Sequence, residues 1–263
     1  MIDTHCHLDD KKYDDYIAEI VADFDKDGID YVISNASKIE LFSKTAGIIS
    51  EYRKVFGAFG VHPHEAKEYT QEIENMIFRY STHDKAVGFG EIGLDYFYNF
   101  SDRPTQRKVF ARQLAVADEL GLPIILHVRD AYEDAFRILQ ENKSKIRHGG
   151  ELHCYSGSLE MAKRFRTEFD FYFAFGGPIT YRNARKDDVI EFLPMNRILS
   201  ETDSPYLTPV PYRGEINEPN LVKYPIERIA QVKELSVEEV NAAIKENTER
   251  LFPKIKVFFK YAG

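Results

Sequence analysis

Six residues that could bind divalent cations occur along the chain, each close to the end of a short apolar run. They are His5, His7, Glu91, His127, His153 and Asp203. His5 and His7 are two positions apart, so on one strand their side chains would point to the same face. If the strands that carry all six residues end at one opening, the side chains meet there and suffice for two cations. This pattern predicts a hydrolase that uses two metal ions.

Taken singly, each of these residues has a more ordinary interpretation. A lone buried histidine is more often a hydrogen-bonded packing residue than a metal ligand, and Asp203, which precedes Ser-Pro, would by itself be a turn or cap residue. The joint pattern changes this balance, because independent structural roles would also scatter such residues over helix surfaces. His83 and His148 are scattered in this way, and we expect them outside the site. Asp203 is therefore expected to bind a cation and to accept the proton of the attacking water.

Glu91 lies in a glycine-rich segment, Gly-Phe-Gly-Glu-Ile-Gly-Leu-Asp, whose glycines let the backbone approach a crowded centre closely. Its carboxylate can bridge two cations, which an imidazole cannot do. His127 and His153 would then bind the second cation. Cys6 and Cys154 each stand beside a histidine of the set. Strand alternation predicts that both thiols point to the opposite face, away from the cations.

The elements that carry these residues alternate between short β-like runs and longer amphipathic stretches. Strands are expected near 1–8, 31–36, 55–61, 86–92, 123–128, 150–155, 171–176 and 197–202. Helices are expected near 13–27, 38–53, 65–81, 105–121, 131–142, 159–169, 183–193 and 221–233, with a further helix near 236–250. Parallel strands need a crossover, which a helix usually supplies. The pattern predicts an α/β fold, a single (β/α)8 TIM-type barrel with an additional C-terminal helix.

A doubly wound open sheet has the same alternation and is the structural alternative. Closure is favoured because the alternation continues through eight units, and because candidate ligands follow strands that are scattered along the sequence. In a barrel all strand ends meet at one opening, whereas in an open sheet such strands would not easily converge. Local signals support the boundaries: Pro104 suits a first helical turn, Gly121 a helix end, and Ser236 with Glu239 a capping box.

The whole chain of 263 residues is expected to be one domain, 1–263, since a single barrel typically takes about 250 residues. No leader or membrane-length apolar run is expected, and two cysteines are too few for a disulfide framework, which predicts a cytoplasmic protein. The net charge of -8 argues against a general nucleic-acid coat, which is usually basic. An enzyme that acts on phosphodiesters remains compatible with this charge, because bound cations create a local anion site.

Seven ordered motifs extend through essentially the whole chain. They are Asp3-Thr-His-Cys-His-Leu8, Gly60-Val-His-Pro-His64, Gly90-Glu-Ile-Gly-Leu-Asp-Tyr96, Leu126-His-Val-Arg-Asp130, His153-Cys-Tyr-Ser-Gly157, Glu201-Thr-Asp-Ser-Pro-Tyr-Leu207 and Arg213-Gly-Glu-Ile-Asn-Glu-Pro219. Together they resemble the TatD-type metal-dependent DNases of the amidohydrolase superfamily. The resemblance implies a β/α barrel with two divalent cations that cleaves phosphodiesters, commonly as a 3′-to-5′ exonuclease on DNA.

The resemblance also implies a role for each matching residue. The ligands of the first cation would be His5, His7, Glu91 and Asp203, and those of the second would be Glu91, His127 and His153. Asp203 and Glu91 would be the catalytic residues.

Four further residues are implied as substrate-binding candidates. His62 matches a pocket histidine near the phosphate, and Arg213 would meet a phosphate or the 3′ end. Arg129 would contact substrate or form an ion pair with Asp130 or a neighbouring loop. His64 would belong to the pocket or to a turn. The chain departs from the resemblance after Gly214, where Glu215 and Ile216 replace a basic segment, which weakens the case for long nucleic acid.

The cofactor is expected to be two divalent cations whose identity stays open among Mg, Mn, Zn, Co and Ni. Four imidazoles favour the transition metals over magnesium, which prefers oxygen, whereas the resemblance implies that magnesium also works. The expected partner is DNA or another nucleotide phosphodiester, with no membrane and no obligate protein partner. One alternative is hydrolysis of small esters, lactones or amides on the same barrel. The other is a non-enzymatic nucleic-acid adaptor, which would predict lost ligands or a strongly basic face.

Overall fold

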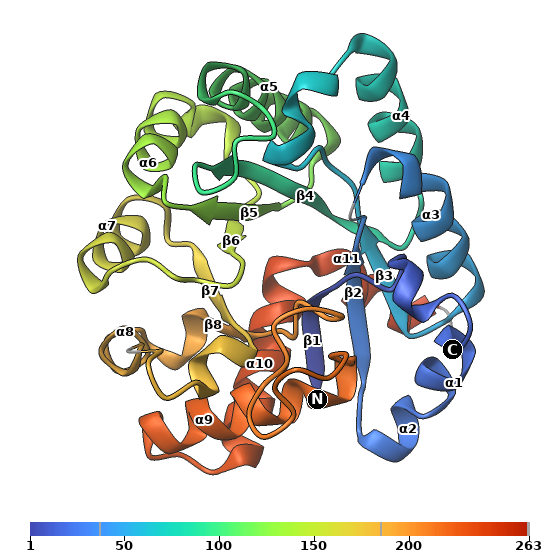
Figure 1. The fold of residues 1–263 in the computed structure, drawn as a ribbon, viewed down its shortest axis with the longest axis vertical. Coiled ribbons are helices and arrows are strands. Elements are labelled where there is room, and N and C mark those ends of the chain that lie inside the picture. Colours follow the sequence, from blue (N-terminus) through green and yellow to red (C-terminus); the bar gives the residue numbers. More distant parts are fainter. Residues whose placement is uncertain (37, 185, 262–263) are drawn as a thin grey trace.

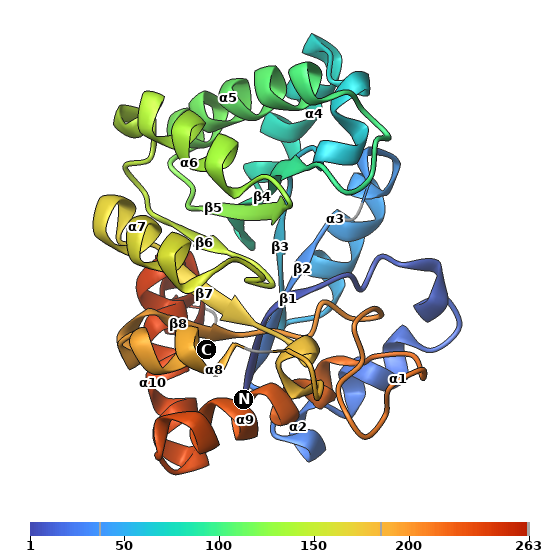
Figure 2. The same ribbon diagram turned by 60° about the vertical axis from the view of Figure 1, so that its left-hand side comes forward.

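Eight parallel strands form a nearly closed barrel with helices around its outside (Figures 1 and 2). The computed structural model describes residues 1–36, 38–184 and 186–261. The strands are β1 (Ile2–Cys6), β2 (Tyr31–Asn35), β3 (Val55–Ala58), β4 (Ala86–Asp95), β5 (Ile124–Arg129), β6 (Gly150–Leu152), β7 (Tyr172–Phe175) and β8 (Ile198–Ser200). Each strand from β1 to β7 pairs in parallel with the next strand along the chain. The barrel therefore follows the order of the sequence.

Helices connect successive strands. They are α1 (Ile17–Ala22), α2 (Phe24–Asp27), α3 (Phe42–Glu51), α4 (Gln71–Ser81), α5 (Arg103–Leu120), α6 (Tyr132–Glu141), α7 (Leu159–Phe169) and α8 (Asp187–Phe192), followed after β8 by α9 (Lys223–Lys233), α10 (Val237–Leu251) and α11 (Pro253–Tyr261). Within the described residues no helix is long and apolar enough to span a membrane.

Closure between β8 and β1 relies mainly on side chains. The hydroxyl of Ser200 donates to the carbonyl of Ile2 at 2.7 Å, and the hydroxyl of Thr4 donates to the carbonyl of Ser200 at 3.1 Å. Beyond β8, the N–H of Asp203 donates to the carbonyl of His5 at 2.8 Å. These bonds exclude the doubly wound open sheet and place Asp203 directly beside His5.

Several local signals form the structures expected of them. Ser236 and Glu239 make a reciprocal capping box at the start of α10, with 3.2 Å from the N–H of Glu239 to the Ser236 hydroxyl. Pro104 lies in the first turn of α5, and Gly121 ends this helix in the left-handed conformation at φ 69°.

Several segments differ from the expected helices. The expected helix 65–81 begins as a 3₁₀ turn, Pro63–Glu68, and α4 starts only at Gln71, where the side chain of Thr70 caps it.

The expected helix 13–27 is divided into α1 and α2, and Tyr13 lies in a preceding 3₁₀ turn, where its hydroxyl donates to the carbonyl of Asn217. This contact with a distant loop overrides local periodicity. The chain also ends in two further helices instead of one, since α11 begins at Pro253, a residue that suits a first helical position. In α11, Ile255 is fully buried.

Candidate metal centre

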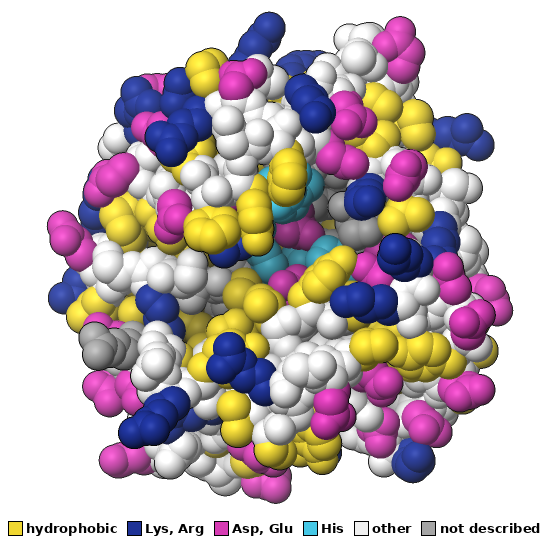
Figure 3. Space-filling model, in the orientation of Figure 1, with side chains coloured by type: hydrophobic (Ala, Val, Ile, Leu, Met, Phe, Trp, Pro, Cys, Tyr) yellow, Lys and Arg dark blue, Asp and Glu magenta, His cyan; other side chains and the backbone are white. Residues whose placement is uncertain are grey.

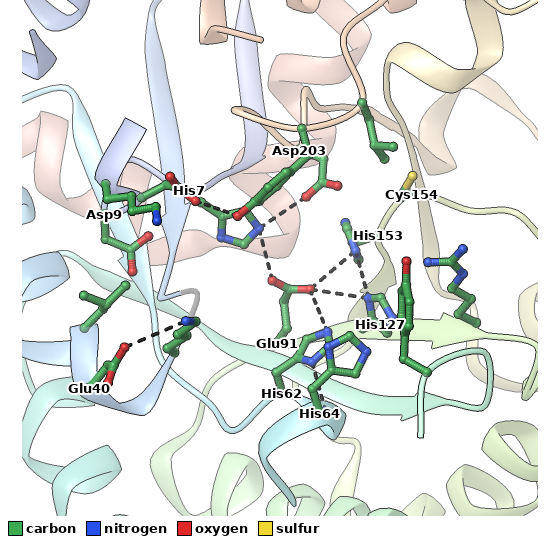
Figure 4. Close-up of a pocket in the computed structure, with 18 of the residues that line it drawn as sticks. His7, Asp9, Glu40, His62, His64, Glu91, His127, His153, Cys154 and Asp203 are labelled. Carbon is green, nitrogen blue, oxygen red and sulfur yellow. Dashed lines mark hydrogen bonds and ion pairs between the residues drawn. The ribbon is translucent and has the colours of Figure 1, made fainter. Parts of the chain in front are cut away.

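A cavity of about 1030 Å³ opens at the carboxyl ends of the strands. Five of the six expected ligands line it, namely His7, Glu91, His127, His153 and Asp203, together with His62, His64 and Arg129. Figure 3 shows histidine and acidic side chains at the bottom of this opening, and Figure 4 shows that they point toward one another. The sixth, His5, is fully buried and lies next to Glu91. The six expected residues therefore come together.

The carboxylate of Glu91 lies at the centre of the cluster, and its two oxygens face different histidines. Oε1 is 3.2 Å from Nε2 of His5 and 3.4 Å from Nε2 of His7. Asp203 completes this side, with Oδ1 at 3.2 Å from Nε2 of His7 and 3.8 Å from Nε2 of His5. Ligand atoms of His5, His7 and Asp203 all lie within 4.8 Å of one another, as one cation requires.

The other oxygen of Glu91 faces a second set of histidines. Oε2 is 3.5 Å from Nε2 of His153, 3.6 Å from Nδ1 of His127 and 3.9 Å from Nε2 of His62. Ligand atoms of His62, Glu91 and His127 form one compact group, and those of His5, Glu91 and His153 form another. His153 stacks on His5 with 3.9 Å between ring centroids. His62 thus lies among the possible ligands as well as in the cavity lining.

Glycines in and beside β4 allow Glu91 to reach this position. A Cβ atom on Gly90 would lie 2.6 Å from Cβ of Ile125 in β5, and one on Gly60 would lie 2.9 Å from the backbone of Gly90. On Gly93, at φ 139°, it would lie 2.0 Å from the carbonyl oxygen of His127. Only glycine fits such close backbone approaches. The strands that carry Glu91 and His127 are therefore held unusually close together.

Two buried carboxylates, Asp95 and Glu201, contact histidines of the site on the side away from Glu91. Neither acid was expected to have a role from the sequence. Oδ2 of Asp95 is 3.1 Å from Nε2 of His127 and 2.8 Å from Nε2 of His64. Oε1 of Glu201 lies 3.5 Å from Nδ1 of His153. Both acids lie within the seven motifs of the sequence, Asp95 in the third and Glu201 in the sixth, but the motifs do not indicate which histidine each acid contacts. Such partners fix the orientation of an imidazole and leave its other nitrogen free for a cation.

Burial and neighbouring charges set the protonation of the cluster. Burial alone raises the pKa of Glu91 and of Asp203, but the surrounding imidazoles outweigh it and hold both pKa values below their usual range. Burial alone lowers the pKa of His7 and of His153, but nearby carboxylates outweigh it. Asp203 and Glu91 raise the pKa of His7 to about 10. Glu201 and Glu91 raise the pKa of His153 to about 10. A cation bound here would displace these protons.

The residues present fit a divalent-cation centre. Among the described residues, neither ring nitrogen of the buried His5 has a hydrogen-bond partner. A buried polar atom without a partner is costly, and a bound cation would remove this cost. The donor set of imidazole nitrogens and carboxylate oxygens suits zinc, manganese, cobalt or nickel, and the carboxylates also suit magnesium. Glu91, with one oxygen toward each histidine set, has the arrangement of a bridging ligand.

The two cysteines behave differently from each other. Cys6 is buried with its sulfur 3.5 Å from the carbonyl of Ile33, outside the cavity, as expected. For Cys154 the expected opposite face was wrong, because its side chain lines the same cavity as His153. Among the described residues it belongs to none of the compact ligand groups, as expected of a thiol that is not a ligand. The strand β6 ends at Leu152, and Cys154 has a left-handed backbone at φ 43°, so strand alternation no longer applies to it.

The remaining candidates lie around the opening. The guanidinium of Arg129 stacks 3.8 Å above the ring of Phe97. Within the described residues it forms no ion pair, so it does not pair with Asp130. His64 was expected either in the pocket or in a turn. It lines the cavity and also belongs to a 3₁₀ turn, so it has both positions. Arg213 does not line the main cavity. It lines an adjacent one of about 380 Å³, 4.4 Å above the ring of Tyr181.

Comparisons with known proteins extend over almost the whole chain. A family model described as TatD related DNase matches residues 2–253. The uncharacterized metal-dependent hydrolase YabD of Bacillus subtilis is 40% identical over 253 residues, 96% of this chain and 98% of that protein. The human 3'-5' RNA nuclease TATDN2 is 36% identical over 207 residues, 75% of this chain but 27% of that protein. The crystal structure of YJJV, a TatD homolog from Escherichia coli K12, gives a TM-score of 0.90 at 28% identity, covering 96% and 98% of the two chains.

Proposed function

This chain belongs to the TatD family of metal-dependent hydrolases, and we propose that it hydrolyses phosphodiester bonds of DNA from the 3′ end. The single observation that carries the proposal is the carboxylate of Glu91 between two sets of imidazoles, with Asp203 beside one of them. The description of the matching family supports DNA as the substrate. The human relative is named a 3'-5' RNA nuclease, which supports the 3′-to-5′ direction but not the choice of DNA over RNA.

The proposed ligands of the cations divide into two sets with one shared carboxylate. His5, His7 and Asp203 would hold one divalent cation, His127 and His153 would hold a second, and Glu91 would bridge the two. His62 lies close enough to Glu91 to join the second set. Two such cations, when bound, supply positive charge that stabilises the phosphorane-like transition state and lower the pKa of water.

Asp203 has the position of the general base. Its carboxylate is ionised, because imidazoles hold its pKa below the usual value, and it lies at the wall of the cavity. It would accept the proton of a water that attacks phosphorus opposite the leaving 3′ oxygen. The bond from phosphorus to that oxygen breaks and yields a 5′-mononucleotide and a new 3′-hydroxyl end. Arg129, without a carboxylate partner among the described residues, would contact the neighbouring phosphate.

Replacing the central carboxylates tests this proposal. Asp203→Asn should lower kcat by about 10²–10⁴-fold, because the proton acceptor is lost, and Glu91→Gln should abolish turnover and weaken cation binding. The measurement is digestion of a 5′-labelled single-stranded oligonucleotide, with magnesium, manganese, zinc, cobalt and nickel added one at a time. A closed circular single strand, which offers no 3′ end, separates exonuclease from endonuclease cleavage.

The matched control is Glu40→Gln, a carboxylate that lines the same cavity at its exposed edge and lies outside the compact ligand groups. It should retain the wild-type rate. Near-normal nuclease activity in both Asp203→Asn and Glu91→Gln would refute the assigned roles. Turnover of lactones or simple esters without any release of nucleotides would favour the alternative hydrolase.

A further inference from the structure

Three large aromatic side chains stand exposed between β4 and α5, beside the cavity. Phe97 is 55% exposed, Tyr98 41% and Phe100 57%. The rings of Tyr98 and Phe100 stack at 5.4 Å with 14° between their planes, and Phe97 meets Tyr98 edge-on at 4.8 Å. We call these three residues the aromatic rim. Contiguous apolar side chains exposed to water often mark a site where a ligand or partner binds. The aromatic rim is therefore a candidate binding surface.

The aromatic rim is joined directly to the metal centre. The backbone N–H groups of Phe97 and Tyr98 each donate to Oδ1 of Asp95 at 2.9 Å. The other oxygen of Asp95 contacts His127, one of the expected ligands. His64 packs edge-on against Phe100 at 4.9 Å. In Figure 3, hydrophobic side chains border the opening in which the histidines are visible.

The loop that carries the rim is held in place at both ends. The hydroxyl of Ser101 donates to the carbonyl of His64 at 2.8 Å and accepts from the N–H of Lys67 at 3.0 Å. The amide of Gln106 donates to the carbonyls of Asp95 and Ser101, each at 2.9 Å. The rings are therefore presented in a fixed arrangement, which lowers the entropy lost when a ligand binds to them.

Positive charge that is free to meet a phosphate lies at the same side of the opening. The guanidinium of Arg129 is 3.8 Å from the ring of Phe97 and 5.0 Å from that of Tyr98, and no described carboxylate pairs with it. Across the cavity, Lys44 pairs with Asp14, so its charge is neutralised. Aromatic faces beside an unpaired guanidinium match the two parts of a nucleotide, a base that stacks and a phosphate that is anionic.

We propose that the aromatic rim, together with Arg129, is a subsite that stacks the unpaired bases of a single-stranded substrate beside the scissile phosphate. The proposal rests on the proposed function and specifies its substrate class. Every base has a π-face, so stacking tolerates any sequence, but in a duplex both faces are already covered by neighbouring base pairs. The subsite therefore favours single strands and unpaired ends over intact duplex.

The test combines a change in the protein with a change in the base. The Phe97→Ala and Phe100→Ala variants are compared with wild type on oligothymidylates that carry 5,6-dihydrothymidine at one or all of the three nucleotides nearest the 3′ end. Dihydrothymidine keeps the hydrogen-bonding edge of thymine but loses its planar aromatic face. On normal oligothymidylate each variant should lose about 5- to 100-fold in kcat/KM, the range expected for one stacked base. On the fully dihydro substrate the variants and wild type should be equal.

Matched variants separate stacking from a general loss of apolar surface. Phe97→Trp should keep the wild-type preference, and Phe97→Leu should behave like Phe97→Ala. Tyr261→Ala removes an aromatic side chain that is more exposed than those of the rim, at 74% in α11, and should change nothing. Manganese binding by calorimetry and the melting temperature should match wild type in all variants, since each replaced side chain is exposed.

The outcomes separate this proposal from the one on which it rests. If wild type cleaves oligonucleotides but Phe97→Ala and Phe100→Ala lose no rate, or lose equally on normal and dihydro substrates, the stacking subsite is refuted while the nuclease stands. If wild type cleaves no phosphodiester, fluorescence anisotropy of a labelled oligothymidylate decides. If wild type binds the oligothymidylate and both variants bind it more weakly, the stacking subsite is supported even without catalysis. If wild type does not bind it, or the variants bind it as tightly as wild type, the stacking subsite is refuted.

Discussion

Glu91 lies in the middle of the metal centre and contacts five of its histidines. Its two oxygens face separate imidazole sets, and His5, which carries no hydrogen bond on either ring nitrogen, lies 3.2 Å from one of these oxygens. Buried acids behind the imidazoles then orient them. Glu201 contacts His153, and Asp95 contacts His127 and His64. Because these acids are outside the ligand set, their contributions can be measured separately from catalysis.

Glu201→Gln is expected to weaken manganese binding by about 10- to 100-fold, the usual effect of removing a carboxylate that orients a ligand histidine. The reason is the contact between Oε1 of Glu201 and Nδ1 of His153 at 3.5 Å, which favours the ring orientation that the cation needs. Isothermal titration calorimetry measures the affinity. Glu151→Gln is the control, because Glu151 is a buried carboxyl group whose two oxygens form no hydrogen bond among the described residues, and burial raises its pKa well above its usual value. Equal affinities in the two variants would contradict the role of Glu201.

Asp95→Asn is expected to change how stability depends on pH. Burial alone raises the pKa of Asp95, but hydrogen bonds from His127, His64 and the loop backbone outweigh it and lower the pKa below its ordinary 3.8. The stabilisation is therefore fully present above about pH 4. It is lost as the pH falls, because the unfolded chain binds the proton first.

Urea unfolding of metal-free protein between pH 6 and pH 3 measures this effect. At pH 6 the wild type should exceed Asp95→Asn in free energy of unfolding by about 1–3 kcal/mol, and the difference should shrink toward pH 3. Asp102→Asn, which alters an exposed helix cap, serves as the comparison. Hydrogen bonds from Thr105 also lower the pKa of Asp102, but this carboxylate is exposed, so its pH-dependent difference should be smaller than that of Asp95→Asn. A difference between wild type and Asp95→Asn that stays constant over this range would contradict the assignment.

At the scale of elements, α11 closes the end of the barrel opposite to the metal centre. Nζ of Lys254 donates to the carbonyl of Ala86, the first residue of β4, at 2.6 Å, and Phe259 packs against Tyr31, the first residue of β2. Ile255→Ala should therefore lower the free energy of unfolding by about 2–5 kcal/mol through the cavity it leaves. The kcat of the folded protein should be unchanged. Val257→Ala, on the exposed side of the same helix, should change stability by less than about 0.5 kcal/mol.

Unfolding in urea and steady-state kinetics on the same preparations check this prediction. An Ile255→Ala variant that loses kcat at temperatures where it is fully folded would show that α11 influences the opposite end of the barrel.

The sequence predicted the parts of the structure that depend on local periodicity and on strand ends. The barrel follows from eight repeated units, and His5, Glu91 and His127 follow from strands whose ends converge. Cys154 was wrongly placed, because the exact end of β6 and the left-handed backbone that follows it have no periodic signal. The roles of Asp95 and Glu201 depend on which distant side chain lies behind which histidine. Such contacts are tertiary, and spacing along one chain does not encode them.

At the scale of the whole molecule, the net charge of -8 opposes binding of an anionic substrate through long-range electrostatic attraction. A protein that holds DNA by its phosphates usually presents a basic face. Here two of the three lysines that line the cavity have acidic partners, Lys38 with Glu40 at 3.8 Å and Lys44 with Asp14, and Lys11 forms no ion pair among the described residues. Affinity must then come mainly from the bound cations and from stacking on the aromatic rim. Electrostatic attraction over longer distances would contribute little.

This mode of binding predicts a weak dependence of affinity on salt. With two to four phosphates neutralised by groups such as Arg129 and Arg213, the slope of log K against log salt for a single strand should be about -1.5 to -3. Fluorescence anisotropy of a labelled oligothymidylate, at fixed manganese and with sodium chloride varied, measures the slope. Arg129→Ala should make it shallower by about 0.7, whereas Arg137→Ala, whose guanidinium pairs with Asp134 at 2.8 Å, should leave it unchanged. A wild-type slope steeper than about -5, the value of an extended phosphate-binding surface, would mean that charge dominates binding after all.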